Sequence, residues 1–254
     1  MAQGRFTDVR RFDTIDSTNR YLLELAAAGA PDGVVAVADT QTAGRGRLGR
    51  TWVAPPGASL LVSVLLRQNV AVTRAHLLTV AAGLAAIDAV RSLAAIDAQL
   101  KWPNDVVVDD RKLAGILAEA NGDAVVLGMG LNVHWTDFPP EIAQAATACN
   151  LESDIPVDRD ALLDAWLATF AARLQDLDRV ARDAVHASAT LGRRVRVELP
   201  AEHFEAHAIA LTPEGHLLVR RADGAEVSVA AGDVVHLRIE GAGDEVAERG
   251  REAR

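Results

Sequence analysis

Cysteine is almost absent from this sequence. Cys149 is its only cysteine among 254 residues, which excludes a disulfide framework and a cluster of thiolate metal ligands. The seven histidines are scattered, and none has the spacing of a common zinc site. We therefore predict neither a disulfide-rich fold nor a zinc protein, and the sequence assigns no metal ligands.

The chain also lacks features of targeting and of membrane insertion. No cationic stretch followed by an apolar core opens it, and no apolar run approaches transmembrane length. The formal net charge of −9 argues against general affinity for nucleic acids or membrane surfaces. These features predict a cytoplasmic protein with neither DNA nor membrane partners.

Acidic residues are missing from one long interval, between Asp39 and Asp88. The same interval holds five arginines, namely Arg45, Arg47, Arg50, Arg67 and Arg74. Three of them alternate with glycines in "GRGRLGR" (44–50). Glycine lets backbone N–H groups approach a ligand, and arginine offers a rigid fork of donors to oxyanions. A positive stretch in an acidic protein favours a small anionic ligand.

Hydrophobic periodicity divides the chain into two structured parts. The first, residues 1–190, mixes strands with helices. The second, residues 191–240, has short strands at even spacing with turn residues between them, which is typical of a small β-barrel. Residues 241–254 have little apolar content and are expected to be a disordered tail.

Several elements of the first part can be placed. We expect a short helix that begins at Ser17 or Thr18 and ends at Gly29. An apolar strand is expected at 58–67, and long helices at 73–93 and at about 158–177. Asp109 and Asp110 are expected to be solvated residues of a turn between strands.

The Arg/Gly stretch has competing interpretations. Gly44, Gly46 and Gly49 match G-x-G-x-x-G, but that fingerprint requires a helix to begin there, and Pro55 and Pro56 exclude one. No Gly-Lys-Ser/Thr ends the stretch, so it is not a P-loop either. A nucleic-acid contact and a solvated loop without a ligand remain open at this point.

Two further segments combine polar groups with small residues. "KWPNDVVV" (101–108) places Asn104 and Asp105 at the start of a strand, where they suit ribose, metal or amide recognition. In "DRKLAGIL" (110–117), Lys112 precedes Gly115, whose missing side chain lets a ligand lie against the backbone. A lysine there can stabilise carboxyl or phosphoryl charge that develops during a reaction. Together these segments favour a site that activates its ligand with a nucleotide.

These motifs resemble those of the bacterial biotin–protein ligases. The resemblance rests on "GRGRLGR", "KWPND", "RKLAGIL" and "GMGLNV", and extends from "DSTN" (16–19) through the C-terminal strands. It implies an α+β fold, with a mixed-sheet catalytic domain of the biotin/lipoate ligase type, helices packed on that sheet, and a small SH3-like β-barrel at residues 191–240.

The resemblance also implies a two-step reaction. Biotin and ATP with Mg²⁺ give biotinyl-5′-AMP and pyrophosphate, and the biotinyl group then passes to one lysine of the biotin carboxyl carrier domain of an acyl-CoA carboxylase. Fixed cations would offset the repulsion between carboxylate and triphosphate, and a closing loop would protect the mixed anhydride from water.

Roles for individual residues follow from the resemblance alone. The expected biotin contacts are Ser17, Thr18, Gln41, Gly44, Arg45, Arg47, Lys112 and Gly115. The expected nucleotide contacts are Arg45, Arg47, Arg50, Trp52, Asn104, Lys112 and Asn132. Lys112, Arg47 and Asp105 are expected to be catalytic, with Lys112 the main cation and Asp105 assisting deprotonation of the acceptor lysine.

The sequence departs from the family at Leu48, where a basic residue is common, and we expect no N-terminal DNA-binding domain. Two alternatives stay open. One is a lipoate or octanoyl ligase or transferase on the same fold, which would have less need of the polar groups at Ser17, Thr18 and Gln41. The other is a module that binds biotin without turnover, which would have no use for Lys112 and the arginines.

Overall fold

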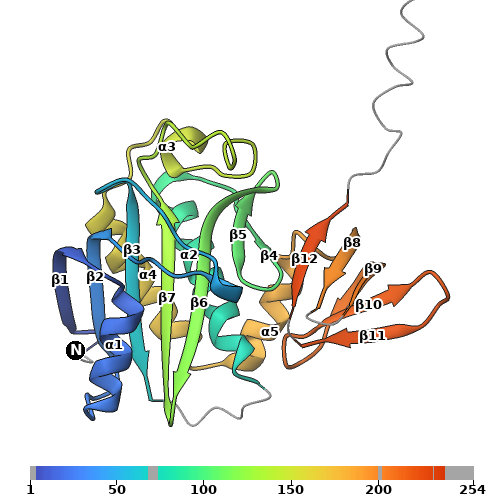
Figure 1. Ribbon diagram of the computed structural model, residues 1–254, viewed down its shortest axis with the longest axis horizontal. Helices are drawn as coiled ribbons and strands as arrows, with labels where there is room; N and C mark the ends of the chain where they lie inside the picture. Colours follow the sequence, from blue (N-terminus) through green and yellow to red (C-terminus); the bar gives the residue numbers. More distant parts are fainter. Residues whose placement is uncertain (1–3, 68–73, 200–201, 231, 238–254) are drawn as a thin grey trace, which may run out of the picture.

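The computed structural model describes residues 4–67, 74–199, 202–230 and 232–237, which form a large mixed sheet with helices and a smaller sheet beside it (Figure 1). The expected tail at 241–254 lies outside the described residues. The helices are α1 (Thr18–Ala27), α2 (His76–Ala94), α3 (Cys149–Glu152), α4 (Arg159–Arg173) and α5 (Leu177–His186).

The large sheet has the strand order β1-β2-β3-β7-β6-β5-β4. Its strands are β1 (Asp8–Ile15), β2 (Val34–Gln41), β3 (Ser59–Leu66), β4 (Gln99–Lys101), β5 (Asp105–Val108), β6 (Arg111–Asn121) and β7 (Ala124–Asn132). The pair β1 and β2 is parallel, and the other neighbours are antiparallel. The expected mixed sheet is confirmed.

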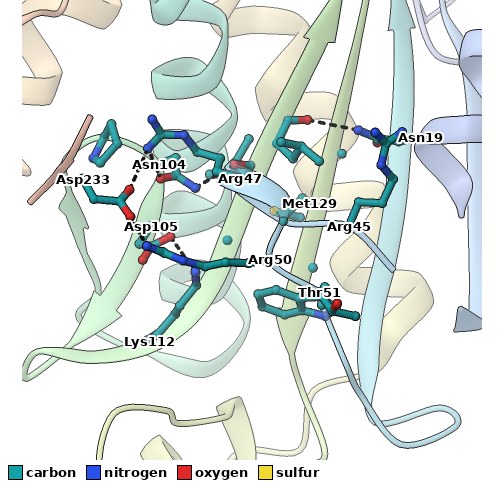
Figure 2. A pocket seen from close by; sticks show the side chains of 18 of the residues that line it. Asn19, Arg45, Arg47, Arg50, Thr51, Asn104, Asp105, Lys112, Met129 and Asp233 are labelled. Carbon is teal, nitrogen blue, oxygen red and sulfur yellow. Dashed lines mark hydrogen bonds and ion pairs between the residues drawn. The ribbon is translucent and has the colours of Figure 1, made fainter. Parts of the chain in front are cut away.

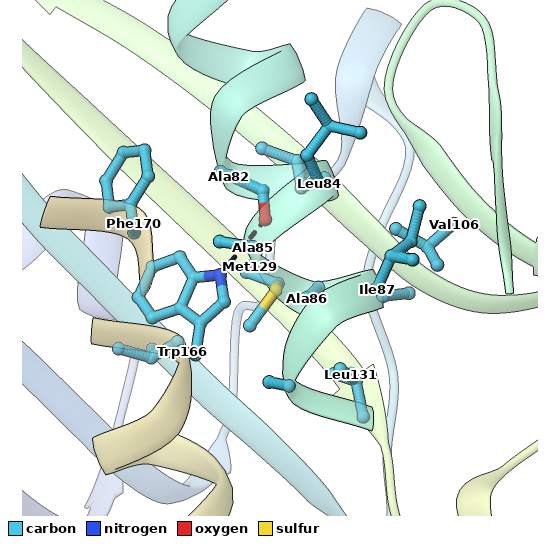
Figure 3. Close-up of a cluster of buried hydrophobic side chains, with 14 of the residues drawn as sticks. Ala82, Leu84, Ala85, Ala86, Ile87, Val106, Met129, Leu131, Trp166 and Phe170 are labelled. Atoms are coloured by element: carbon cyan, nitrogen blue, oxygen red, sulfur yellow. Dashed lines mark hydrogen bonds between the residues drawn. The ribbon is translucent and has the colours of Figure 1, made fainter. Parts of the chain in front are cut away.

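Helices cover both faces of this sheet, which explains why every residue of β3 is buried. Helices α2 and α4 pack on one face, and α1 packs on the other against β2, β3 and β7 (Figure 1). Trp166 of α4 stacks on Phe170 with ring centroids 5.2 Å apart, and its indole N–H donates to the Ala82 carbonyl of α2 at 3.1 Å (Figure 3). Alanines on α2 leave room for this aromatic pair.

One helix does reach transmembrane length, contrary to the expectation from sequence. The 19 residues of α2 are apolar enough to cross a membrane, but 78% of the most apolar stretch is buried inside the protein. Gly83 lets the helix approach the sheet closely, because a Cβ there would lie 2.6 Å from Leu100 Cδ2. The apolar character of α2 is therefore that of a core helix.

The helix expected at about 158–177 is in fact two helices. Asp158 accepts from the Ala161 N–H and caps α4, which ends at Arg173. Asp176 then accepts from the Arg179 N–H and caps α5, so a second helix begins where the first was expected to end. The buried Leu174 and the partly buried Leu177 continue the helical spacing across the break, which hid the new cap in the sequence.

The smaller C-terminal sheet is antiparallel, with the order β11-β10-β9-β8-β12. Its strands are β8 (Arg194–Glu198), β9 (His203–Leu211), β10 (Leu217–Arg221), β11 (Glu226–Val229) and β12 (Asp233–His236). Among the described residues β11 and β12 are its two edges. Trp102, from the loop between β4 and β5, packs into the core of this sheet and donates to the Gly215 carbonyl at 3.1 Å.

A buried histidine also joins the two sheets. His236 lies 3.1 Å from Asp110 Oδ1 through Nδ1 and 3.1 Å from Thr190 Oγ1 through Nε2. Arg193 donates to the same aspartate at 2.6 Å. Burial acts to raise the pKa of Asp110, but these two partners outweigh it and hold that pKa below its ordinary value. Asp110 therefore joins the large sheet to the C-terminal strands through His236 and Arg193, and is not merely a solvated turn residue.

Candidate active site

A cavity of about 290 Å³ lies between the N-terminus of α1, the Arg/Gly loop, strands β6 and β7 of the large sheet, and the edge strand β12 of the smaller one (Figure 2). Its wall combines backbone glycines with uncharged polar groups and with charges. The expected site residues on this wall are Ser17, Thr18, Gln41, Arg45, Arg47, Arg50, Trp52, Asn104, Asp105, Lys112 and Gly115.

One end of the cavity is lined by uncharged polar side chains. The Ser17 hydroxyl accepts from the Arg20 N–H and caps α1, which fixes Thr18 at the helix start. Gln41 Oε1 accepts from the Thr18 N–H at 2.8 Å. The buried Ser63 hydroxyl of β3 lies 2.7 Å from Thr18 Oγ1 and 2.6 Å from Asn19 Oδ1. This end can hold a neutral polar group that both donates and accepts hydrogen bonds.

Asn19 needs a glycine beside it. A Cβ at Gly128 would lie 2.1 Å from Asn19 Oδ1, so only glycine leaves room for this amide. The Asn19 Nδ2 group donates to Glu119 Oε2 at 2.9 Å, and Arg45 pairs with Glu119 Oε1 at 3.0 Å. The polar end is therefore connected to the Arg/Gly loop through one carboxylate.

Two paired glycines form a flat floor in the middle of the cavity. Gly115 of β6 and Gly130 of β7 are direct partners in the ladder, and the Trp52 indole lies over both. A Cβ at Gly130 would lie 2.3 Å from Trp52 Cε2. The indole Nε1 is buried and has no hydrogen-bond partner among the described residues. The Trp52 side chain therefore packs on these two glycines and forms part of the cavity wall together with them, in addition to its place at the edge of the loop.

The other end of the cavity is charged. Lys112 Nζ lies 2.7 Å from Asp105 Oδ1 and 5.5 Å from the Trp52 ring centroid. The Lys112 backbone is held on both sides, because its N–H donates to Ala145 O at 2.7 Å and its carbonyl accepts from Thr147 N at 2.9 Å. A β-bulge between Val106 and Val107 shifts the pairing of β5 with β6 next to this lysine. A fixed ammonium group therefore faces the cavity.

The Arg/Gly loop is held over this charged end by its own backbone and by its arginines (Figure 2). Trp52 N donates to Gly44 O at 3.0 Å, and a Cβ at Gly44 would lie 2.3 Å from Trp52 O. The Arg47 guanidinium donates to Asn104 Oδ1 at 3.0 Å. Burial lowers the pKa of Arg47 while Asp233 and Asp105 act to raise it, and the group stays charged at neutral pH.

Two expected residues are not brought to the cavity wall. Gly44 lies where the two arms of the Arg/Gly loop meet, and its missing side chain lets their backbones approach each other closely. Asn132 is buried, with Oδ1 accepting from the Ser59 hydroxyl at 3.1 Å and Nδ2 donating to Thr147 O at 2.9 Å. Both ends of that amide are engaged inside the protein, so this structure gives no support to a nucleotide contact by Asn132.

The sequence reasoning missed other residues at this cavity, namely Asn19, Ser63, Gly128, Gly130 and Asp233. Ser63 left a readable signal, because it is a polar residue in the middle of the apolar run of β3. The two glycines stand in the quoted "GMGLNV" but were given no role. Asp233 left no signal, since it is more than 180 residues from the loop that it contacts.

Comparisons with known proteins agree with this architecture. Residues 11–134 match the Biotin/lipoate A/B protein ligase family, and residues 190–237 match the Biotin protein ligase C terminal domain. A biotin–[acetyl-CoA-carboxylase] ligase of Mycobacterium tuberculosis is 43% identical over 87% of this chain and 86% of its own length. A bifunctional ligase/repressor of Bacillus spizizenii is 31% identical over 84% of this chain and 69% of its own length.

Solved structures give the same result. The biotin protein ligase of Aquifex aeolicus, in complex with biotin and ATP, superimposes with a TM-score of 0.82 at 27% identity and covers 92% of this chain and 100% of its own. The chain therefore belongs to the biotin/lipoate A/B protein ligase family. Its relatives identify it further as an enzyme of the biotin–protein ligase class, which confirms the resemblance seen in the motifs.

Proposed function

We propose that this enzyme joins biotin to ATP as biotinyl-5′-AMP and transfers the biotinyl group to a lysine of the biotin carboxyl carrier domain of an acyl-CoA carboxylase. The observation that carries the proposal is the single cavity in which a neutral polar end, a flat glycine floor and a fixed Lys112 follow one another. Biotin has a matching sequence of groups, with a polar ring system at one end and a carboxylate at the other.

In the first step, a biotin carboxylate oxygen attacks the α-phosphorus of ATP, and the bond from that phosphorus to pyrophosphate breaks. We assign the ureido group to Ser17, Thr18 and Gln41. Lys112 and Arg47 stabilise the negative charge that grows on the α-phosphoryl oxygens. Arg45, Arg50, Trp52 and Asn104 are assigned to the remaining contacts with the adenylate, as the resemblance implied.

In the second step, the neutral acceptor amine attacks the acyl carbon, AMP leaves, and the amine loses a proton. Asp105 is assigned the role of accepting that proton, because its carboxylate lies at the cavity beside Lys112.

Mg²⁺ is proposed to bind together with ATP. No group of three or more His, Cys, Asp or Glu side chains among the described residues could hold a metal ion by itself. Mg²⁺ usually needs only one or two carboxylates in addition to substrate phosphates, and Asp105 at the cavity fits that requirement. Bound there, the ion would neutralise phosphate charge.

The proposal is tested by mixing the protein with ATP and either biotin or lipoate and measuring pyrophosphate release. A carrier domain is then added, and biotin on it is detected with streptavidin. We expect release and transfer with biotin. Release with lipoate alone would favour the lipoate alternative, and biotin binding without release would favour a binding module.

A further inference from the structure

The backbone of Lys112 is held by a segment that takes the place of a strand. Strand β7 pairs with β6 only from Ala114 onward. Two residues earlier, at Lys112, β6 is bordered instead by residues 145–147, which lie in the connection between β7 and α3 and form a parallel bridge with it. This segment binds both peptide groups of the lysine, because Ala145 O accepts its N–H and Thr147 N donates to its carbonyl. The position of the lysine therefore depends on residues outside the regular sheet.

Thr147 uses all of its polar groups in this arrangement. The residue is completely buried. Its N–H donates to the Lys112 carbonyl at 2.9 Å, and its own carbonyl accepts from Asn132 Nδ2 at 2.9 Å. Its hydroxyl donates to Glu152 Oε1 through a close contact. One buried threonine thus joins strand β6, the end of β7 and helix α3.

Glu152 leads these contacts back to β6. The oxygen that accepts from Thr147 also lies 3.0 Å from Arg111 Nη2, and the Glu152 side chain is only 10% exposed. A carboxylate that is shielded in this way and held by two donors keeps its geometry better than an exposed ion pair does. Arg111 directly precedes Lys112 in β6. The contacts that leave the Lys112 carbonyl therefore return to the same strand one residue away, and this closed ring restricts the peptide that carries the lysine.

Neither Thr147 nor Glu152 is among the described residues that line the cavity, so an effect of theirs on the reaction has to pass through a residue of its wall. A cation stabilises developing charge only where it is held in the right place, and a displacement of about 1 Å can cost roughly 10²-fold in rate. We propose that Thr147 and Glu152 are positioning residues for adenylation, which act by holding the Lys112 ammonium group in place. This inference rests on the proposed function of the cavity.

The first test compares two substitutions of the buried hydroxyl. Thr147→Val removes it and should slow pyrophosphate release about tenfold, while the Kd for biotin changes by no more than about twofold. Thr147→Ser keeps the hydroxyl and should release pyrophosphate nearly as fast as the wild type. Thr79→Val is the matched control, because Thr79 is a buried threonine of α2 that lies outside the ring of contacts. A serine variant as slow as the valine variant, or a valine variant as fast as the wild type, would overturn the proposal.

The second test asks whether the effect passes through the lysine. In the Lys112→Ala background, Thr147→Val should slow pyrophosphate release by less than about twofold, because the group that it positions is gone. The same tenfold loss in both backgrounds would overturn the proposal, since an independent structural effect adds to the loss of the lysine. If Thr147→Val does not fold, Glu152→Gln changes the ring from its less buried side and should show the same lack of additivity with Lys112→Ala.

The third test does not depend on the reaction. Lys101 and Lys112 are the only lysines of the chain, so protein made with lysine that carries ¹³C at its carbonyl carbon gives two backbone signals in NMR spectra. The position of such a signal depends on the hydrogen bond that the carbonyl oxygen accepts. Glu152→Gln should move the Lys112 signal and leave the Lys101 signal in place, and an unmoved Lys112 signal would overturn the proposal. A moved signal in a protein whose wild type releases no pyrophosphate from biotin and ATP would support the ring of contacts and refute the proposed function.

Discussion

At the scale of single residues, Lys112 is fixed on several sides at once. Its backbone is bonded to Ala145 and Thr147, its ammonium group pairs with Asp105, and the Trp52 ring lies beside it. A cation fixed before the substrate arrives does not have to reorganise as charge develops, which is the condition for strong electrostatic stabilisation. The sequence predicted this residue from its position before Gly115, but it did not predict what holds the lysine in place.

Replacement of Lys112 by alanine should therefore slow adenylation more than it weakens biotin binding. We expect a loss of about 10²-fold or more in pyrophosphate release, the scale of removing one preorganised charge donor. Calorimetry with biotin and a pyrophosphate assay separate the two effects. The control is Lys101→Ala, because Lys101 is the only other lysine of the chain and lines the same cavity. Lost biotin affinity with full residual turnover would contradict the assigned role.

A second prediction at this scale concerns His76 at the start of α2. Burial, together with the nearby charge of Arg47, lowers the pKa of His76 from 6.5 to about 4. The unfolded chain therefore takes up a proton near pH 6.5 that the folded protein refuses, and stability falls as the pH drops through this range toward 4. His76 should account for about 2 kcal/mol of the stability lost between pH 7 and pH 5.

The variant His76→Gln carries no titrating group and should lose less stability over that range. Urea unfolding of both proteins at pH 7 and pH 5 measures the difference. Parallel losses in the two proteins would show that His76 is not the group responsible. The matched control is His134→Gln, because His134 is exposed.

At the scale of elements, the Arg/Gly loop joins the polar end of the cavity to the charged end. Arg45 reaches Glu119 on β6, and Arg47 reaches Asn104 and the start of β12. The composition of the loop predicts an anion-binding stretch, and this stays a prediction. Its partners could not be predicted, because Glu119 and Asp233 come from strands that only the fold brings to the loop.

Arg47→Gly should release the loop and let the intermediate escape. The variant keeps Lys112 and the polar end, so we expect some adenylation to remain while biotinyl-5′-AMP reaches bulk solvent and labels lysines of other proteins. A streptavidin blot of added albumin compares it with the wild type, and Lys112→Ala serves as the control that makes little intermediate. Retained adenylation without increased albumin labelling would refute the role of Arg47 in retention.

At the scale of the whole molecule, the two sheets share one packed boundary. Trp102 belongs by sequence to the first part of the chain, but its side chain is 5% exposed within the core of the smaller sheet. His236 and Asp110 add a polar contact across the same boundary. The pattern of short strands predicted the smaller sheet, and the division at residues 190 and 191 remains a prediction. The sequence does not indicate that Trp102 packs into the core of the smaller sheet. A tryptophan beside a proline in "KWPND" is equally compatible with a residue of the binding site.

Trp102→Ala should therefore destabilise the smaller sheet first. Truncating a buried tryptophan typically costs about 3–5 kcal/mol, and here most of the lost contacts belong to the C-terminal strands. Limited proteolysis should show faster cleavage within residues 191–237. Trp166→Ala is the comparison, since it opens a cavity of the same kind in the core of the large sheet. Equal cleavage patterns in the two variants would contradict the shared boundary.

The central claim is that one cavity first makes an acyl-adenylate and then delivers its acyl group to a lysine. The most direct measurement is a rapid-quench experiment in which the protein, biotin and ATP are mixed without a carrier, and bound products are identified by mass spectrometry. The account predicts that biotinyl-5′-AMP accumulates to the concentration of the enzyme. It then disappears, on addition of a carrier domain, in step with carrier biotinylation and AMP release. A carrier that becomes biotinylated while no adenylate forms, or an adenylate that the carrier does not consume, would contradict it.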